Sequence, residues 1–407
     1  MNYHKSTDLI NLLKTVTTHT SHDKLNHNAF IFDNAHLLQT NKLHPKLKFL
    51  LDDMLVAFTS NLLIENVQSI SKSILRLRFK KFNELVNSVT KSKFNSDLQS
   101  MNDILTFKLT VNSHIVTINF IMHEIYHHLI ATIIHAINTF CHLFKHDYHN
   151  LTINVCLDHN KRDLILPTEY KIKTRNDYRD IFHFLQKKSY AYNASGMTNI
   201  NEKVIYITRT EEIIKLLFHE LSHYAKLDYQ LLFMPITDFK LSVETETHTL
   251  NSSEAYTEFM AVILNSAYQT IHLFGLKHKT NELFYDTYAK LLSIETEYSC
   301  YLASIILKFY DYDKHNVMDF FLGIGEKKYS PIAIWEYVFL RAQLMLNLDA
   351  VLKIVHNNWI IDRNNQTLLI NLMTVDERMI QKVKKYMEYE PNINISYTMI
   401  DFDWNKF

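Results

Sequence analysis

Apolar residues recur every three or four positions through the second half of the chain, whereas nearer the middle they alternate in short runs. From Glu211 onward the spacing is largely helical, and Leu47–Val89 shows the same period. Short alternating runs predict strands at Phe107–Phe120, Leu151–Val155 and Val204–Thr208. The pattern therefore predicts an α+β fold that is mainly α-helical.

The most apolar stretch, Ile115–Phe144, predicts a helix that is buried or half-buried. It contains six His and Glu residues, too many for a membrane span of about twenty apolar residues, so we expect no transmembrane segment. Further short strands are predicted at Asp163–Leu166 and Tyr170–Lys173. We expect three parts: a helical region at 1–150 that is a separate domain or a lid, a small sheet with two chemically important helices at 151–265, and a helical part at 266–407.

Composition narrows the class of protein. The chain has 407 residues with only four Gly and five Pro, which disfavours turn-rich β folds, and its formal net charge is zero. The basic run Arg76–Phe82 therefore predicts a solvated helix face better than a nucleic-acid site, and no nucleic-acid partner is expected. The N-terminus is polar, without the apolar core of a signal peptide. Three cysteines without metal or redox spacing indicate free thiols, so we expect a cytoplasmic or otherwise intracellular protein.

One predicted helix carries the clearest chemistry. His219, Glu220 and His223 form an H-E-x-x-H sequence, and on a helix positions i and i+4 share a face. Both imidazoles can therefore reach one zinc ion while Glu220 acts as general base on water at the metal. Thr208 with Glu211 three residues later predicts a capping box at the start of this helix.

A second helix follows with two carboxylates one turn apart. Ser252–Leu264 has a Ser cap and an apolar run that contains Glu254 and Glu258. Glu254 is the candidate third zinc ligand, and Glu258 lies one turn deeper, where it can orient a ligand His. His248 is the alternative third ligand, but its segment alternates like a strand or loop.

Together these helices resemble the gluzincins, the zinc peptidases of the thermolysin and aminopeptidase N type, in which H-E-x-x-H is followed by a helix with N-E-x-x-x-E/D. Ser253–Phe259 looks like the aminopeptidase version, N-E-G-F-A-E-Y, with Ser in place of Asn and Ala in place of Gly. The resemblance implies a gluzincin-like catalytic core that binds Zn²⁺ through His219, His223 and Glu254, with Glu258 supporting a ligand. Metzincins are disfavoured, because their Gly and third His are absent.

The segment Ser195–Asn199 resembles the G-x-M-E-N loop of the aminopeptidase-type enzymes, which precedes the zinc helix by a similar distance. By that resemblance Gly196, Met197 and Asn199 line the substrate cleft. Thr198 stands where the family has a Glu that grips the free amine of the substrate. This departure bears on aminopeptidase specificity and leaves peptidase chemistry untouched.

Peptide hydrolysis also needs a donor for the oxyanion. Gluzincins commonly supply a Tyr or His from a later segment, and Tyr329 is our candidate, because the following Ser-Pro predicts a helix start. Tyr310, Tyr312 and His315 are rivals.

His123–His127 is a second H-E-x-x-H sequence. No later helix pairs it with a Glu-x-x-x-Glu sequence, and it lies among histidines in heptad spacing, which share one side of a helix. We interpret it as a polar helical stripe rather than as the zinc site; an accessory metal site is the alternative. The heptad histidines are His128, His135, His142 and His149.

The sequence thus predicts a zinc metallopeptidase that acts on a peptide or protein substrate. The alternative is a catalytically inactive, peptidase-like protein that binds metal or partners without cleaving them. A third hypothesis is a helical protein without metal, in which both H-E-x-x-H sequences are coincidences.

Overall fold

The computed structural model describes residues 42–87, 93–158, 195–237, 239–245, 247–274, 282–330, 333–389 and 398. The chain divides into two compact units. Unit 1 comprises residues 1–51, 166–178 and 228–407, and unit 2 comprises residues 52–165 and 179–227. The predicted divisions after 150 and 265 do not coincide with these boundaries. The strands predicted at Asp163–Leu166 and Tyr170–Lys173 lie outside the described residues.

Unit 2 is built on a six-stranded mixed sheet with the order β1-β2-β3-β4-β6-β5. Its first three strands are antiparallel, β4 and β6 run parallel to β3, and β5 is antiparallel to β6. The strands are β1 (Leu63–Val67), β2 (Asp103–Val111), β3 (His114–Met122), β4 (Thr152–Leu157), β5 (Gly196–Asn199) and β6 (Val204–Ile207). The strands predicted in the β4 and β6 regions are confirmed.

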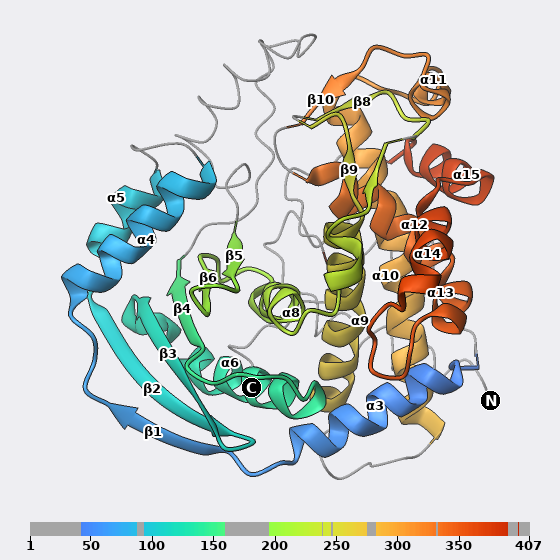
Figure 1. Ribbon diagram of the computed structural model, residues 1–407. Coiled ribbons are helices and arrows are strands. Elements are labelled where there is room, and N and C mark those ends of the chain that lie inside the picture. The colour runs from blue at the N-terminus through green and yellow to red at the C-terminus, as the bar shows by residue number, and fades with distance from the viewer. Residues whose placement is uncertain are drawn as a thin grey trace. The chain divides into compact units, whose positions relative to one another are not determined.

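Helices cover both faces of this sheet (Figure 1). On one face lie α6 (His127–Leu143) and α8 (Ile213–Tyr224), which pack together through the stacked rings of Phe140 and Phe218. On the other lie α4 (Lys72–Asn87) and α5 (Lys93–Ser100), whose apolar residues form a cluster with Ile121 and Cys156 of the sheet. The described residues of unit 2 therefore form three layers.

Two predictions for this unit are wrong in detail. Phe107–Phe120 is a hairpin of β2 and β3 rather than one strand, because Asn112 and Ser113 both adopt positive φ, at 50° and 66°. Positive φ at both central residues is typical of the tight turns that join antiparallel strands. The helix predicted at Ile115–Phe144 begins only at His127, since β3 occupies its first part.

The basic run at Arg76 lies on α4, where Leu75, Phe79 and Phe82 are buried. The Arg76 guanidinium donates to the main-chain oxygens of Leu98 and Met101, at 3.1 and 2.9 Å. The apolar side chains of α4 are thus buried while Arg76 binds main-chain oxygens, as expected for an amphipathic helix. The helix predicted over Leu47–Val89 is interrupted by β1, which follows α3 (Pro45–Phe58).

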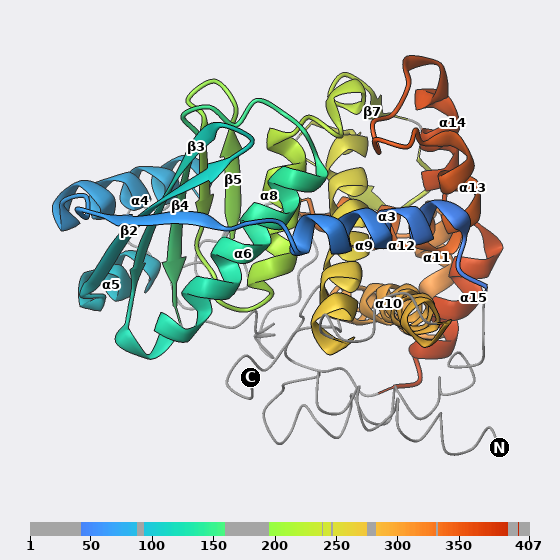
Figure 2. The same cartoon turned by 90° about the horizontal axis from the view of Figure 1, so that it is seen from below.

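Unit 1 is helical and centres on α9 (Ser252–Phe274), which packs against α10 (Glu282–Phe309), the π-helical segment η6 (Glu336–Leu340) and α12 (Arg341–Leu346) (Figure 2). From Ala255 to Ile271 every residue of α9 is buried. A helix that is buried all round needs apolar or paired side chains on every face.

The other described elements of unit 1 are shorter. Two small sheets pair β8 (Val243–Glu244) with β10 (Lys328–Tyr329) and β7 (Pro235–Ile236) with β9 (Leu250–Asn251). The remaining helices are η4 (Tyr229–Leu231), α11 (Val317–Leu322), α13 (Leu348–Ile354), η7 (Arg363–Asn365), α14 (Gln366–Met373) and α15 (Glu377–Tyr386), while η2 (Glu124–Tyr126) precedes α6 in unit 2.

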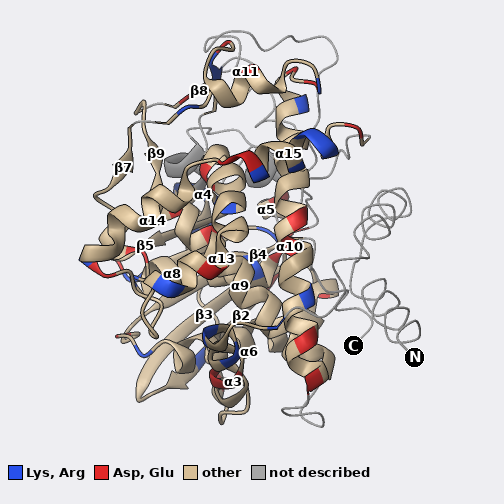
Figure 3. Cartoon of the chain, turned by 90° about the vertical axis from the view of Figure 1, so that its right-hand side faces the viewer, with Lys and Arg blue, Asp and Glu red and all other residues tan. Residues whose placement is uncertain are grey.

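The fold is thus mixed α and β and mainly helical, as predicted. Among the described residues no helix is both long and apolar enough to cross a bilayer. Cys141, Cys156 and Cys300 are buried free thiols. Basic and acidic residues are interspersed on α10 and α15 (Figure 3).

Candidate metal centre

The helix α8, which carries the first H-E-x-x-H sequence, is fixed in place by burial of its apolar side chains. Ile213, Leu217 and Leu221 are at most 1% exposed, and the helix packs on β5, β6 and α6. Its predicted capping box is wrong. The Thr208 hydroxyl and amide both bond to the Ser195 oxygen and so extend the pairing of β5 and β6, and α8 begins only after Glu212.

The two histidines of α8 point toward one another. Their Nε2 atoms are 3.2 Å apart and the rings are tilted by 76°. Two nitrogens bound to one tetrahedral zinc, at the usual Zn–N distance, lie about 3.3–3.4 Å apart. The distance between the His219 and His223 nitrogens is therefore close to the distance expected between two nitrogens on one zinc ion.

Glu220 lies against the edge strand β5. The Thr198 hydroxyl donates to Glu220 Oε2 at 2.7 Å and is 2.9 Å from the Glu220 main-chain oxygen. A Cβ atom on Gly196 would come within 2.3 Å of Glu220 Oε1. The Glu220 carboxylate is thus held against β5, on the same helix as the two histidines.

The other predicted residues of β5 have different surroundings. Met197 packs against the apolar cluster beneath α4 and α5, because successive side chains of a strand point to opposite faces. Asn199 Oδ1 accepts a hydrogen bond from Glu202 N at 3.1 Å and closes the following turn. A contact of either side chain with substrate stays a prediction. On β5 the Glu220 carboxylate meets the hydroxyl of Thr198 and the bare Cα of Gly196.

The predicted third ligand belongs to unit 1, at the start of α9. Asn251 Oδ1 accepts from the amides of Ser253 and Glu254, at 3.0 and 3.4 Å. The predicted Ser cap is therefore wrong: the capping side chain is Asn251, whereas the Ser252 hydroxyl donates to Met234 O at 2.8 Å. An Asn cap satisfies amides that the first turn leaves unpaired.

Both carboxylates of α9 have partners on the segment that follows Trp335. The Tyr337 hydroxyl donates to Glu254 Oε2 at 3.1 Å. The Arg341 guanidinium donates to Glu258 Oε1 at 3.1 Å, and both side chains are at most 3% exposed. Glu258 is therefore half of a buried ion pair, and its predicted contact with a ligand His stays a prediction.

The π-helical segment η6 also carries a third carboxylate. Glu336 is 4% exposed and its Oε1 accepts from Asn251 N at 2.9 Å. The pKa of Glu336 is raised to about 7, mainly by burial and also by the charge of Glu254, while hydrogen bonds from main-chain amides act to lower it. Single π-helical turns occur often at functional sites. Here the π-helical turn and the residue after it present Glu336, Tyr337 and Arg341 to the first turns of α9.

Tyr329, the predicted oxyanion donor, is 2% exposed on β10. Its main-chain oxygen accepts from the Tyr310 hydroxyl at 3.0 Å, and the Tyr312 hydroxyl donates to Glu326 O at 3.1 Å. His315 is exposed, as is His248, the alternative third ligand. These observations leave the catalytic role of Tyr329 a prediction and give the two rival tyrosines structural hydrogen bonds.

The second H-E-x-x-H sequence does not lie on one regular α-helix. His123 has extended backbone, Glu124–Tyr126 is a 3₁₀ turn, and α6 begins at His127. The His127 imidazole lies 3.4 Å from Asp103. The i, i+4 geometry of the sequence is therefore lost. His128, His135 and His142 each bond a main-chain oxygen, at 2.8–3.0 Å, as expected for a polar stripe.

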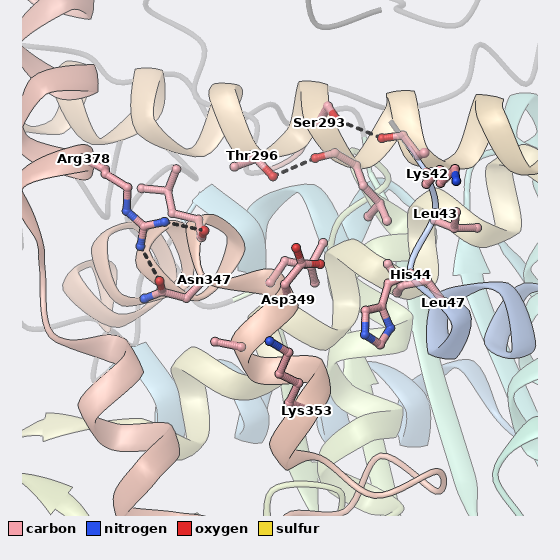
Figure 4. Close-up of a pocket in the computed structure, with 15 residues that line it drawn as sticks. Lys42, Leu43, His44, Leu47, Ser293, Thr296, Asn347, Asp349, Lys353 and Arg378 are labelled. Carbon is pink, nitrogen blue, oxygen red and sulfur yellow. Dashed lines mark hydrogen bonds between the residues drawn. The ribbon is translucent and has the colours of Figure 1, made fainter. Parts of the chain in front are cut away.

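Unit 1 also contains a cavity of about 590 Å³ between the start of α3, α10 and α13. Figure 4 shows His44, Asp349 and Lys353 around it. The guanidinium of Arg378 at its edge is bound to Asp376, with Nε 2.9 Å from Oδ2. Acidic and basic side chains both line the cavity, and the Arg378 guanidinium is already paired with Asp376. We therefore assign no ligand to the cavity.

The chain is similar to a protein described as "Uncharacterized protein R210" from Acanthamoeba polyphaga mimivirus. The two are 38% identical over 363 residues, which cover 88% of this chain and 91% of the mimivirus protein. The chain belongs to the family of that protein. No family model matches the chain, and neither does any solved structure. Since the relative's name states no activity, the function is argued from the residues of the site.

The sequence did not predict the contacts that four residues make at the site. Thr198 was noted only as a replaced Glu, and Glu336, Tyr337 and Arg341 were not singled out. Neither H-E-x-x-H nor Glu-x-x-x-Glu fixes the position of a supporting residue more than eighty positions away. The one available signal was a Glu, a Tyr and an Arg within six residues of a strongly apolar helix.

Proposed function

We propose that the protein is a zinc-dependent metallopeptidase with a gluzincin-like active site. His219, His223 and Glu254, a set of His and Glu side chains that could hold a metal ion, are the proposed ligands. The observation that carries the proposal is the convergence of the two Nε2 atoms, 3.2 Å apart, on the helix that also bears Glu220. The donor set of two imidazoles and one carboxylate is typical of catalytic zinc.

Zinc, when bound, supplies a Lewis acid that polarises a carbonyl and lowers the pKa of water. Glu220 accepts a proton from the attacking water and passes it to the leaving amine. His219 and His223 would hold the ion through neutral nitrogens, and the Tyr337 hydroxyl, which donates to Glu254 Oε2, would orient that carboxylate toward it. Tyr329 remains our candidate donor to the oxyanion.

The edge strand β5 can pair with an extended peptide substrate. Thr208 N donates to Ser195 O at 2.8 Å, so these residues form a hydrogen-bonded pair. In an antiparallel ladder hydrogen-bonded pairs alternate, and the register pairs Gly196 with Ile207 and Thr198 with Ile205. The main-chain groups of Gly196 and Thr198 therefore point away from β6, where a substrate strand can pair with them.

The test is Glu220→Gln in the zinc-loaded protein. Gln keeps the shape and still accepts from Thr198 but cannot take a proton, so zinc should stay bound while hydrolysis of a quenched fluorescent peptide library falls at least about 100-fold. Glu202→Gln, an exposed carboxylate of the same unit, is the control and should keep full activity. Undiminished turnover in Glu220→Gln would refute the general-base role. Zinc without turnover in the wild type would favour the inactive, partner-binding alternative.

A further inference from the structure

The contact between β5 and α8 involves the side of the strand that faces Glu220. Side chains alternate along a strand, and the opposite face is taken by Met197, which packs in the apolar cluster beneath α4 and α5. Gly196 and Thr198 therefore share the face toward α8. One residue of this pair is a hydroxyl donor and the other has no side chain.

These two residues act on different oxygens of one carboxylate. Oε2 of Glu220 accepts from the Thr198 hydroxyl at 2.7 Å. Oε1 lies where a Cβ atom of Gly196 would be, at 2.3 Å. The glycine therefore leaves room for one oxygen while the threonine binds the other.

We propose that Thr198 is a positioning residue that fixes the carboxylate of Glu220 for proton transfer. This inference rests on the proposed function, in which Glu220 is the general base. A Glu side chain has three rotatable torsions, and a base acts only from within hydrogen-bond reach of the water proton. The hydroxyl of Thr198 selects one arrangement of those torsions before substrate arrives.

The position of Thr198 also limits what else it does. Its hydroxyl has one proton, and both of its acceptors belong to Glu220: Oε2 at 2.7 Å and the main-chain oxygen at 2.9 Å. The side chain is therefore directed at α8, and substrate meets this residue through the main-chain groups at the strand edge. Removal of the hydroxyl should change turnover more than substrate affinity.

The experiment compares Thr198→Val, which keeps the shape and removes the hydroxyl, with Thr198→Ser, which keeps the hydroxyl. We expect kcat to fall about 10- to 100-fold in the Val variant, because small misplacements of a catalytic group cost rates of this order. KM should stay within about threefold and zinc content should be unchanged. The Ser variant should recover most of kcat.

The matched control is Thr106→Val. Thr106 is a buried threonine of the same unit, 4% exposed, whose hydroxyl donates to the buried Asn119 Oδ1 at 3.0 Å. Its loss should lower thermal stability while kcat is retained. Equal losses of kcat in Thr106→Val and Thr198→Val would show a structural effect and overturn the positioning role.

A second readout does not depend on activity. Thr198→Val should lower Tm in the wild-type background and change it less in a Glu220→Ala background, because the partner is then absent. Equal shifts in the two backgrounds would overturn the inference whatever the activity. A non-additive result in a zinc-loaded protein without turnover would instead refute the proposed function while leaving the contact intact.

Discussion

The ion pair between Arg341 and Glu258 gives the sharpest stability prediction. The Arg341 side chain is 0% exposed, that of Glu258 is 3% exposed, and Nη1 lies 3.1 Å from Oε1. Arg341→Met leaves the Glu258 carboxylate buried without this cation. Loss of one partner of a buried pair costs about 3–5 kcal/mol, far more than the net contribution of the pair itself. We therefore expect a fall of this size in the free energy of unfolding.

Urea denaturation followed by tryptophan fluorescence suits this test. Trp335 and Trp359 are buried in unit 1, so their fluorescence reports on the unit that contains the pair. Arg378→Met is the matched control, because the Arg378–Asp376 pair is exposed, at 56% and 36%. Its loss should cost at most about 1 kcal/mol.

A double variant completes the comparison. Glu258→Gln combined with Arg341→Met removes both charges and should recover most of the lost stability, since a buried pair can often be replaced at little cost. The reasoning is refuted if Arg341→Met costs no more than Arg378→Met. It is refuted equally if the double variant is less stable than Arg341→Met alone.

Three further predictions concern the site. Tyr337→Phe removes the hydroxyl 3.1 Å from Glu254 Oε2 and should weaken zinc binding about 10-fold in a competitive chelator titration; unchanged affinity would contradict this. Gly196→Ala should displace the Glu220 carboxylate, because the new Cβ would lie 2.3 Å from Oε1, and should lower kcat while zinc stays bound; full activity would show that the strand yields. Burial raises the pKa of Glu336 from 4.5 to about 7, so the folded state binds this proton more tightly than the unfolded state and stability falls as pH rises through that window. Glu336→Gln should therefore gain on the order of 1–3 kcal/mol relative to wild type between pH 5 and pH 8 in urea denaturation, and a pH-independent difference would contradict the assignment.

Local patterns in the sequence predicted the elements that carry the site. The apolar spacing around His219 indicated a helix with both imidazoles on one face, and the structure shows that face. The strand predicted before this helix, at Val204–Thr208, is also confirmed, since Val204–Ile207 forms β6. These predictions succeeded because period and spacing are properties of a few consecutive residues.

Predictions failed where a capping or turn residue had competing partners. Thr208 has the spacing of a capping box, yet its hydroxyl binds Ser195 O, because the strand pairing extends to that residue. Thr374 and Glu377 have the same capping-box spacing before the last described helix, but the capping side chain there is that of Asp376, which accepts from Met379 N. Asn112 and Ser113 split one expected strand into two. The outcome for Thr208 depends on strand pairing with a residue 13 positions away, whereas the other two were decided between neighbouring residues that allow more than one local structure.

The residues that bind the two carboxylates of α9 could not be predicted from the sequence. Glu254 and Tyr337 are 83 residues apart, as are Glu258 and Arg341. Their meeting follows from the packing of α9 against the π-helical segment and α12, which no local period indicates.

The central claim is that one zinc ion is shared by His219, His223 and Glu254. The most direct measurement is the zinc content of the purified protein after equilibration with zinc and removal of excess, in the wild type and in His219→Ala, Glu254→Ala and Glu220→Gln. The account predicts one zinc per chain in the wild type and in Glu220→Gln, and little or none in the two ligand variants. A wild type that retains no zinc, or ligand variants that retain as much as the wild type, would contradict it.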